Sequence, residues 1–204
     1  MEMMMKLASI FFTMILVENY VLVKFLGICP FLGVSKKLDS AFGMSLAVTF
    51  VMVMATAVTW PIQNFLLPPA SGAWDLGYLQ TIVFILVIAI LVQLLENFLK
   101  KFIPALYKSL GVYLPLITTN CTILGVTILN LDNGYNFIES IVCAAGAGIG
   151  FLLAMVLFSG VRRRVEQAQP PKCFEGLPIT LVAAAMVSLS FMGFGGIVSG
   201  IFGV

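Results

Sequence analysis

The chain alternates long apolar runs with short polar segments. A helix that crosses a bilayer needs about 20 predominantly apolar residues, and six runs come close to that length. By residue number they are 7–26, 41–60, 79–95, 109–131, 140–161 and 177–201. Pro61 is expected to end the second run. No segment between the runs could form a soluble domain, so the pattern predicts an all-α integral membrane protein with a single membrane domain over residues 1–204.

Composition supports this class and excludes others. Hydrophobic residues make up 61% of the 204 residues and charged residues 10%, with a mean hydropathy of +1.10. Soluble domains carry about 25% charged residues, so much of this surface is expected to face a lipid bilayer. A net charge of +2 without a basic stripe argues against a nucleic-acid partner. The chain has no histidine, so any metal chemistry must use thiolates or carboxylates.

Positive charges predict the orientation of the chain, because cytoplasmic loops carry an excess of Lys and Arg. Nine such residues follow the first, third or fifth run: Lys36, Lys37, Lys100, Lys101, Lys108, Arg162, Arg163, Arg164 and Lys172. The opposite side, which includes both termini, holds only Lys6. We therefore expect both termini outside and the basic loops in the cytoplasm.

A short motif occurs twice. Residues 29–35 read CPFLGVS, and residues 121–127, 92 positions later, read CTILGVT. Helix-breaking or polar residues accompany both copies. The repeat unit is three helices, and an odd number of crossings reverses the second copy relative to the first. The sequence therefore predicts six transmembrane helices as an inverted-topology repeat of 3+3 (about 5–99 and 105–204), with broken first and fourth helices and a site near the bilayer midplane.

Residue counts place both cysteines at depth. Cys121 lies 13 residues after Lys108 and 11 before Asp132, about 20 Å and 16 Å at 1.5 Å per helical residue. In a hydrocarbon core about 30 Å thick, that position is near the centre. Cys29 lies 8 residues before Lys37, which is also consistent with mid-depth. The run before Cys29 is too long for a half-helix, so its start is expected to tilt or to lie in the interface.

Local sequence predicts that a new helix half begins at each cysteine. Pro30 suits the first position of a helix, with Cys29 as its cap. Thr119 and Asn120 supply polar capping groups directly before Cys121. The positive end of a helix favours an anion such as a thiolate. Two inverted half-helices would then present two thiolates from opposite sides at one depth.

The four cysteines do not all invite the same interpretation. A buried cysteine usually packs as a small hydrophobe, and that interpretation suits Cys143 and Cys173. For Cys29 and Cys121, the repeat and the helix breakers favour a thiolate site, and Gly27 allows close backbone approach there. A disulfide between them would add little to a bundle already held by lipid. Two thiolates are too few for an iron–sulfur cluster, which normally takes four, although a related partner chain could supply the other two.

Residues 25–35 (FLGICPFLGVS) and 114–121 (LPLITTNC) resemble the A-subunit family of the Rnf ion-translocating ferredoxin:NAD oxidoreductase complexes. The same residues also resemble, slightly less closely, the E subunits of the Na⁺-translocating NADH:quinone reductases. The similarity covers nearly the whole chain. It implies a multi-pass component of a bacterial or archaeal cell membrane. Its partners would be a homologous six-helix subunit of opposite topology and further Rnf subunits, including flavin and iron–sulfur subunits.

The resemblance also implies a cofactor. Each of the two paired subunits would donate two cysteines to a 2Fe–2S cluster inside the membrane, where electrons cross the bilayer. In this chain the ligands would be Cys29 and Cys121. The residues around the cluster would be Gly27, Pro30, Thr119 and Asn120.

Two carboxylates suggest an ion path for Na⁺ or H⁺, because acidic residues in apolar spans are energetically costly. They are Glu18 and Glu96, and the alternative for Glu96 is an ion pair with Lys100 four residues later. Residues 146–150 (GAGIG) superficially match a nucleotide-binding motif. They lie inside an apolar run with no preceding strand, so close helix packing is the better interpretation.

Together these features predict a membrane subunit of an ion-translocating electron-transport complex. It would carry electrons between ferredoxin-side and NAD-side centres, without a catalytic residue of its own. Two other classes remain open. An inverted-repeat secondary transporter would take up substrate in liposomes and tolerate loss of the cysteines. A structural scaffold would assemble and transfer electrons with either cysteine replaced.

Overall fold

The computed structural model describes residues 2–35, 38–66, 77–102, 116–117, 119–168, 171 and 174–193. Every regular element in these ranges is helical, which confirms the all-α prediction for them. In chain order they are α1 (Glu2–Phe12), the π-helix η1 (Thr13–Val17), α2 (Ile28–Val34), α3 (Leu38–Leu66), α4 (Gly77–Phe102), α7 (Cys121–Asp132), α8 (Phe137–Gln167) and α9 (Leu177–Met192). The sequence predictions for Lys36, Lys37, Lys108, Lys172 and Cys173 lie outside the described residues.

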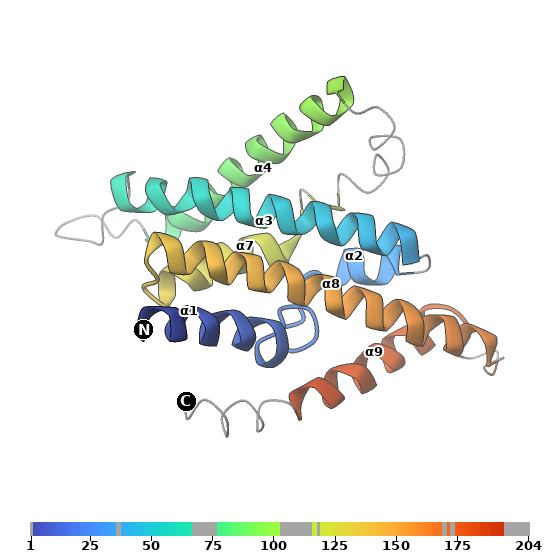
Figure 1. Ribbon diagram of the computed structural model, residues 1–204. Coiled ribbons are helices and arrows are strands. Elements are labelled where there is room, and N and C mark those ends of the chain that lie inside the picture. Colours follow the sequence, from blue (N-terminus) through green and yellow to red (C-terminus); the bar gives the residue numbers. More distant parts are fainter. Residues whose placement is uncertain are drawn as a thin grey trace.

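Two long antiparallel helices, α3 and α8, form the centre of the molecule (Figure 1). They approach closely because α8 carries small residues on the shared face: a Cβ added to Gly148 would lie 2.7 Å from Oγ1 of Thr49 on α3. On another face of α8, a Cβ added to Gly146 would lie 3.2 Å from the carbonyl oxygen of Phe11 at the end of α1. The prediction that residues 146–150 serve close helix packing is therefore confirmed.

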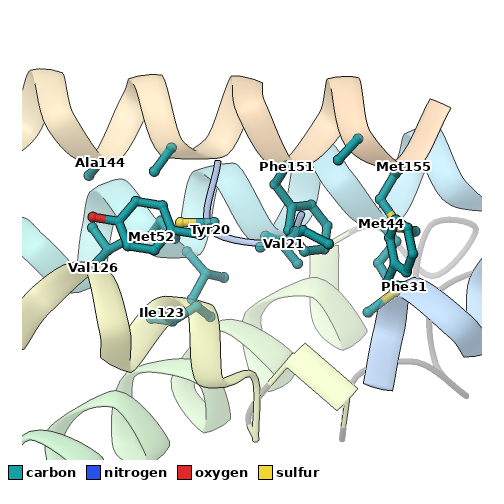
Figure 2. Close-up of a cluster of buried hydrophobic side chains, with 14 of the residues drawn as sticks. Tyr20, Val21, Phe31, Met44, Met52, Ile123, Val126, Ala144, Phe151 and Met155 are labelled. Atoms are coloured by element: carbon teal, nitrogen blue, oxygen red, sulfur yellow. The ribbon is translucent and has the colours of Figure 1, made fainter. Parts of the chain in front are cut away.

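The core lies between α3, α7, α8 and the first helical segments (Figure 2). Met52 of α3, Ile123 of α7 and Phe151 of α8 are each 1% exposed or less. Phe31 of α2 stacks on Phe158 of α8, with ring centroids 4.2 Å apart. In a membrane protein such packing gains van der Waals contact rather than removal from water. The short helix α2 is thus packed against the central pair.

Apolar side chains also cover the outside of the helices. Phe42, Leu46, Phe50 and Met54 are exposed on α3 at four-residue spacing, which places them on one helix face. Helices α4 and α9 expose similar residues, among them Ile82, Leu86, Ile90, Leu181, Met186 and Leu189. A surface of this kind suits lipid or neighbouring subunits better than water.

Among the described residues, two helices are long and apolar enough to cross a membrane, over Leu38–Asn64 in α3 and Phe137–Gln167 in α8. Four shorter apolar helices cover Met3–Val17, Thr81–Leu94, Cys121–Asp132 and Leu177–Met192. The described residues therefore hold an apolar helix in each of the six predicted runs, and two of these helices reach full spanning length by themselves.

The prediction that Pro61 ends the second helix is wrong, because α3 continues to Leu66. Proline removes one backbone hydrogen bond and its ring crowds the preceding turn. Here the Pro61 ring is exposed, and α7 and α8 pack along the same helix. In membrane helices an internal proline is tolerated where neighbouring elements support the backbone.

Candidate functional site

The first apolar run breaks in its second half. The helical arm ends at Val17, and the chain then forms turns from Glu18 until α2 begins at Ile28. Asn19 holds this break, because its fully buried Nδ2 donates to the carbonyl oxygen of Gly150 at 2.9 Å on α8. Its Oδ1 accepts from the backbone N–H of Val21 at 3.1 Å. The run before Cys29 is too long for a single half-helix, and the turns from Glu18 to Gly27 contain its excess residues.

The cysteine half-helix α2 begins earlier than the sequence predicted. Its N-cap is Gly27, with φ of 82° in the left-handed region, and Cys29 and Pro30 are its second and third residues. The prediction of Cys29 as the cap and Pro30 as the first helical residue is therefore wrong. Glycine adopts positive φ without strain, so it can turn the chain into α2 where Cys29 could not. Pro30 is buried.

The second cysteine begins α7 as predicted. Asn120 is the N-cap, and its Oδ1 accepts from the backbone N–H of Thr122 at 3.1 Å. Cys121 is the first residue of the helix. The Sγ atom of Cys121 lies 4.0 Å from the carbonyl oxygen of Thr119. Thr119 is itself exposed.

The two breaks meet. A Cβ added to Gly27 would lie 3.0 Å from Oδ1 of Asn120 and would overlap Oγ1 of Thr122. Leu26, which precedes Gly27 in the chain, packs against α7. A Cβ added to Gly125 of α7 would lie 2.6 Å from Cδ1 of Leu26. The N-caps of α2 and α7 are therefore in contact, although 93 positions separate them in the chain. Cys29 follows one cap by two residues and Cys121 follows the other by one.

The cysteines at this junction differ from the third described one. Cys29, Cys121 and Cys143 are all free thiols, but the first two are exposed and Cys143 is buried. The interpretation of Cys143 as a packing residue agrees with this burial. Within the described ranges, no three His, Cys, Asp or Glu side chains gather closely enough to hold a metal. These residues alone therefore offer two thiols rather than a complete ligand set.

Two buried donors at the junction lack a partner among the described residues. They are Nδ2 of Asn120, in a side chain 4% exposed, and Oγ1 of Thr122, in a side chain that is fully buried. A buried polar group usually has a hydrogen-bond partner, so an unpartnered one calls for an explanation such as a bound group. Hydrogen bonds to cluster and cysteine sulfurs are one such use. Two exposed thiols, each one or two residues past helix caps that touch, fit one half of an iron–sulfur site.

The far end of α2 is held by an arginine of α8. Arg162 is 8% exposed and donates from one guanidinium nitrogen to the carbonyl oxygen of Leu32 at 2.5 Å and to Oγ of Ser35 at 2.8 Å. Its Nε pairs with Glu166 at 3.1 Å. Cations are favourable at a helix C-terminus. In the sequence, Arg162 is first of all an orientation signal, and nothing in its local pattern indicates a partner 130 residues away.

The two predicted ion-path residues lie apart in the fold. Glu18 sits in the break and pairs with Lys24 at 2.9 Å, with the two side chains 41% and 28% exposed. Lys24 also lies 5.2 Å from the centre of the Tyr20 ring. Glu96 is half-buried on α4, six residues before Phe102 ends the helix. The one ion pair of Glu18 in the described part of the chain is thus with Lys24, and α4 holds Glu96 on a different element from either cysteine.

Comparison with known proteins shows which family the chain belongs to. The family model described as "Rnf-Nqr subunit, membrane protein" matches residues 7–198. The chain belongs to the Rnf-Nqr family. The chain is also 55% identical over 192 residues to the A subunit of the Na⁺-translocating ferredoxin:NAD⁺ oxidoreductase complex of Acetobacterium woodii, covering 94% of this chain and 98% of that protein.

Two further relatives are named as A subunits of ion-translocating oxidoreductase complexes. The chain is 53% identical over 186 residues to that of Syntrophotalea carbinolica, covering 91% of this chain and 94% of the relative. It is 54% identical over 184 residues to that of Serratia proteamaculans, covering 90% and 93%. This Rnf-Nqr chain is thus similar to A subunits along nearly its whole length, as the two cysteine motifs indicated.

Proposed function

We propose that this chain is a membrane subunit of an ion-translocating electron-transport complex. Cys29 and Cys121 would be half of the ligands of a 2Fe–2S cluster, which a homologous six-helix subunit of opposite topology completes. Electrons would pass through the bilayer here, between ferredoxin-side and NAD-side centres, coupled to Na⁺ or H⁺ movement. The observation that carries the proposal is the contact between Gly27 and Asn120, because it brings both cysteine motifs to one junction.

The proposed fold is an inverted repeat, and equivalent positions support it. Thr49 and Gly148, which face each other, each lie eleven residues past the first residue of their helix. Cross-contacts also occur in pairs. Arg162 of α8 holds the end of α2, while Nε1 of Trp60 on α3 donates at 3.1 Å to the carbonyl oxygen of Tyr135, just after α7. The long helix of each half of the chain thus holds the end of the cysteine half-helix of the opposite half.

A midplane position for the site is supported by the tie between Asn19 and Gly150. Gly150 lies 13 residues after Phe137 and 17 before Gln167, the two ends of α8. Because α8 is long enough to span a bilayer, its middle corresponds to the midplane. The break in the first helix, and with it the junction, would lie near that depth.

The proposed orientation places both termini outside the cell membrane and the basic loops in the cytoplasm. Figure 1 shows the start of α3 and the end of α8 at one end of the molecule, and α4 runs obliquely from the opposite end toward that side. The described positive charges of that end include Lys100, Lys101, Arg163 and Arg164. The opposite end holds the start of α1, where Lys6 pairs with Glu139 at 2.8 Å.

The residues of this chain would perform three tasks. Cys29 and Cys121 present sulfur ligands on an exposed face, where a partner subunit can reach them. Asn120 and Thr122 offer buried donors to sulfur, and Gly27 lets the two helix starts touch. When bound, an iron–sulfur cluster stores and passes single electrons, with a potential that such hydrogen bonds tune. For the coupled ion, Glu96 and Glu18 remain the proposed path, and Na⁺ is the ion named for the Acetobacterium woodii relative.

The test is Cys29→Ser and Cys121→Ser in the purified complex, read by EPR. Each variant is expected to lose the midplane 2Fe–2S signal, whereas a Cys143→Ala control, buried away from the surface, keeps it. A retained signal in either serine variant would overturn the ligand assignment. Normal assembly and electron transfer in both would favour a scaffold instead. The family description names Nqr beside Rnf. If the resemblance to the quinone-reductase subunit holds instead, assays of the complex with ferredoxin and with quinone would separate the two.

A further inference from the structure

A polar pocket lies between α3, α7 and α8. It is lined by Thr56, Thr59, Trp60, Thr127, Asn130, Leu131 and Ser140. Five of these residues bring a side-chain oxygen, and each of the five is 3% exposed or less. Burying five polar side chains together is costly in a bundle of apolar helices unless their polar atoms are paired.

Two of the five oxygens have no partner in the described part of the chain. They are Oγ1 of Thr56 and Oδ1 of Asn130, both in side chains 2% exposed. The hydroxyls of Thr59 and Thr127 are each paired at 2.8 Å with a carbonyl oxygen of their own helix. That of Ser140 bonds the carbonyl oxygen of Tyr135 at 3.4 Å. These three hydroxyls donate their hydrogens elsewhere, so their oxygens keep lone pairs available for an acceptor role.

Water does not account for the two unpartnered oxygens. A water molecule needs about 10–15 Å³ of accessible space, and the pocket has no room for a water-sized sphere. A dehydrated Na⁺ ion is smaller than water and is bound by oxygen atoms. In membrane transporters, Na⁺ is coordinated by uncharged oxygens and by the C-terminal ends of half-helices. Asn130 lies two residues before the end of α7 at Asp132.

The absence of a charged side chain among the described residues that line the pocket points to a monovalent ion. Divalent Ca²⁺ and Mg²⁺ sites rely on carboxylates, and none of these lining residues is acidic. We propose that this pocket binds one Na⁺ ion through Thr56 Oγ1 and Asn130 Oδ1, with the neighbouring hydroxyl oxygens completing the shell. The site is separate from Glu18 and Glu96. The proposal depends on the proposed function in one respect only, namely that the ion bound here would be the ion that the complex moves.

The decisive variant is Thr56→Val in the purified complex. Valine has the shape of threonine and removes an oxygen that has no partner among the described residues, so no known bond within the chain is lost. Equilibrium dialysis with radioactive Na⁺ measures binding, and thermal unfolding in NaCl against choline chloride measures the stabilisation that a bound ion brings. We expect Thr56→Val to raise the half-saturating Na⁺ concentration about tenfold, as for the loss of one ligand bond.

Two matched variants complete the design. Thr56→Ser keeps the oxygen and should retain Na⁺ binding. Thr180→Val removes a buried hydroxyl at 4% exposure from α9, near the opposite end of α8 (Figure 1), and should leave Na⁺ binding unchanged. Should Thr56→Val fail to assemble, Thr56→Ala takes its place. Unchanged Na⁺ binding in Thr56→Val or Thr56→Ala would overturn the proposal, as would equal losses in Thr180→Val.

The same preparations separate this proposal from the proposed function. Loss of Na⁺ binding in Thr56→Val, with the EPR signal retained, supports the ion site. If Cys29→Ser keeps its EPR signal while Na⁺ binding still depends on Thr56, the cluster assignment fails and the ion site stands. If Thr56→Val binds Na⁺ normally while Cys29→Ser loses its signal, the ion site fails and the cluster assignment stands.

Discussion

Gly27 lies against Asn120, and each residue is the N-cap of a helix that carries one of the paired cysteines. The two caps belong to opposite halves of the chain. Because they touch, a change at either cap displaces the start of both cysteine helices. The junction therefore couples the starts of α2 and α7.

Gly27→Ala is expected to destabilise the purified complex and to weaken its EPR signal. The new Cβ would overlap Thr122 Oγ1, lie 3.0 Å from Asn120 Oδ1 and sit on a backbone with φ of 82°. Left-handed backbone costs about 1–2 kcal/mol and overpacking about 1–3 kcal/mol. The midpoint of thermal unfolding and the signal amplitude measure the two effects.

Gly134→Ala is the control for backbone strain alone. Gly134 has φ of 63°, and a Cβ there would meet nothing within 4 Å. It should lower stability by the backbone cost only, about 1–2 kcal/mol, and leave the EPR signal intact. Equal losses in the two variants would show that crowding at the junction has no role.

Arg162→Gln is expected to loosen the end of α2. It removes the charged donors to Leu32 and Ser35, and hydrogen bonds to charged groups contribute about 1.5–3 kcal/mol. Arg162→Lys should recover part of this loss, because lysine keeps the charge but not the planar fork. Arg163→Gln, at an exposed position, is the control. Equal unfolding midpoints for Arg162→Gln and Arg163→Gln would contradict the anchoring role.

Asn19→Leu is expected to collapse the break in the first helix. It leaves the carbonyl oxygen of Gly150 and the backbone N–H groups of Val21 and Leu22 without their partner. Each unsatisfied buried group costs about 1–3 kcal/mol, so this variant should be the least stable of the set. Asn97→Leu, at an exposed position on α4, is the control for replacing an asparagine with leucine where no buried tie is lost. Comparable stability of the two variants in thermal unfolding would rule out the proposed tie.

Thiol labelling should distinguish the cysteines in the detergent-solubilised chain separated from its partner subunits and from iron. In a Cys173→Ser background, a maleimide is expected to modify Cys29 and Cys121, which are exposed, and to spare Cys143 until the protein unfolds. Mass spectrometry of the digested chain measures the labelled fraction of each of the three cysteines. Labelling of Cys143 at the same rate as Cys121 would contradict the burial of Cys143.

The parts of the site that sequence predicts correctly are local ones. Asn120 caps α7 through a bond to the N–H two residues later, and such a bond depends only on neighbouring residue types. The predicted start of α2 is wrong for the opposite reason. Gly27 becomes the cap because the preceding turns are held by Asn19, whose partner Gly150 lies 131 positions away. The predicted end of the second helix at Pro61 is also wrong, since α7 and α8 pack along α3 and the helix continues to Leu66.

By itself the sequence determined the membrane class, the order of the apolar helices and the pairing of the Cys29 and Cys121 motifs. These follow from composition, run length and helix-breaking residues, which act over a few positions of the chain. Only the tertiary structure decided that Gly27 meets Asn120, that Arg162 holds α2, and that Thr56 and Asn130 share one buried pocket. Each of these contacts joins residues far apart in sequence, and the close packing of α3 against α8 is what brings them together.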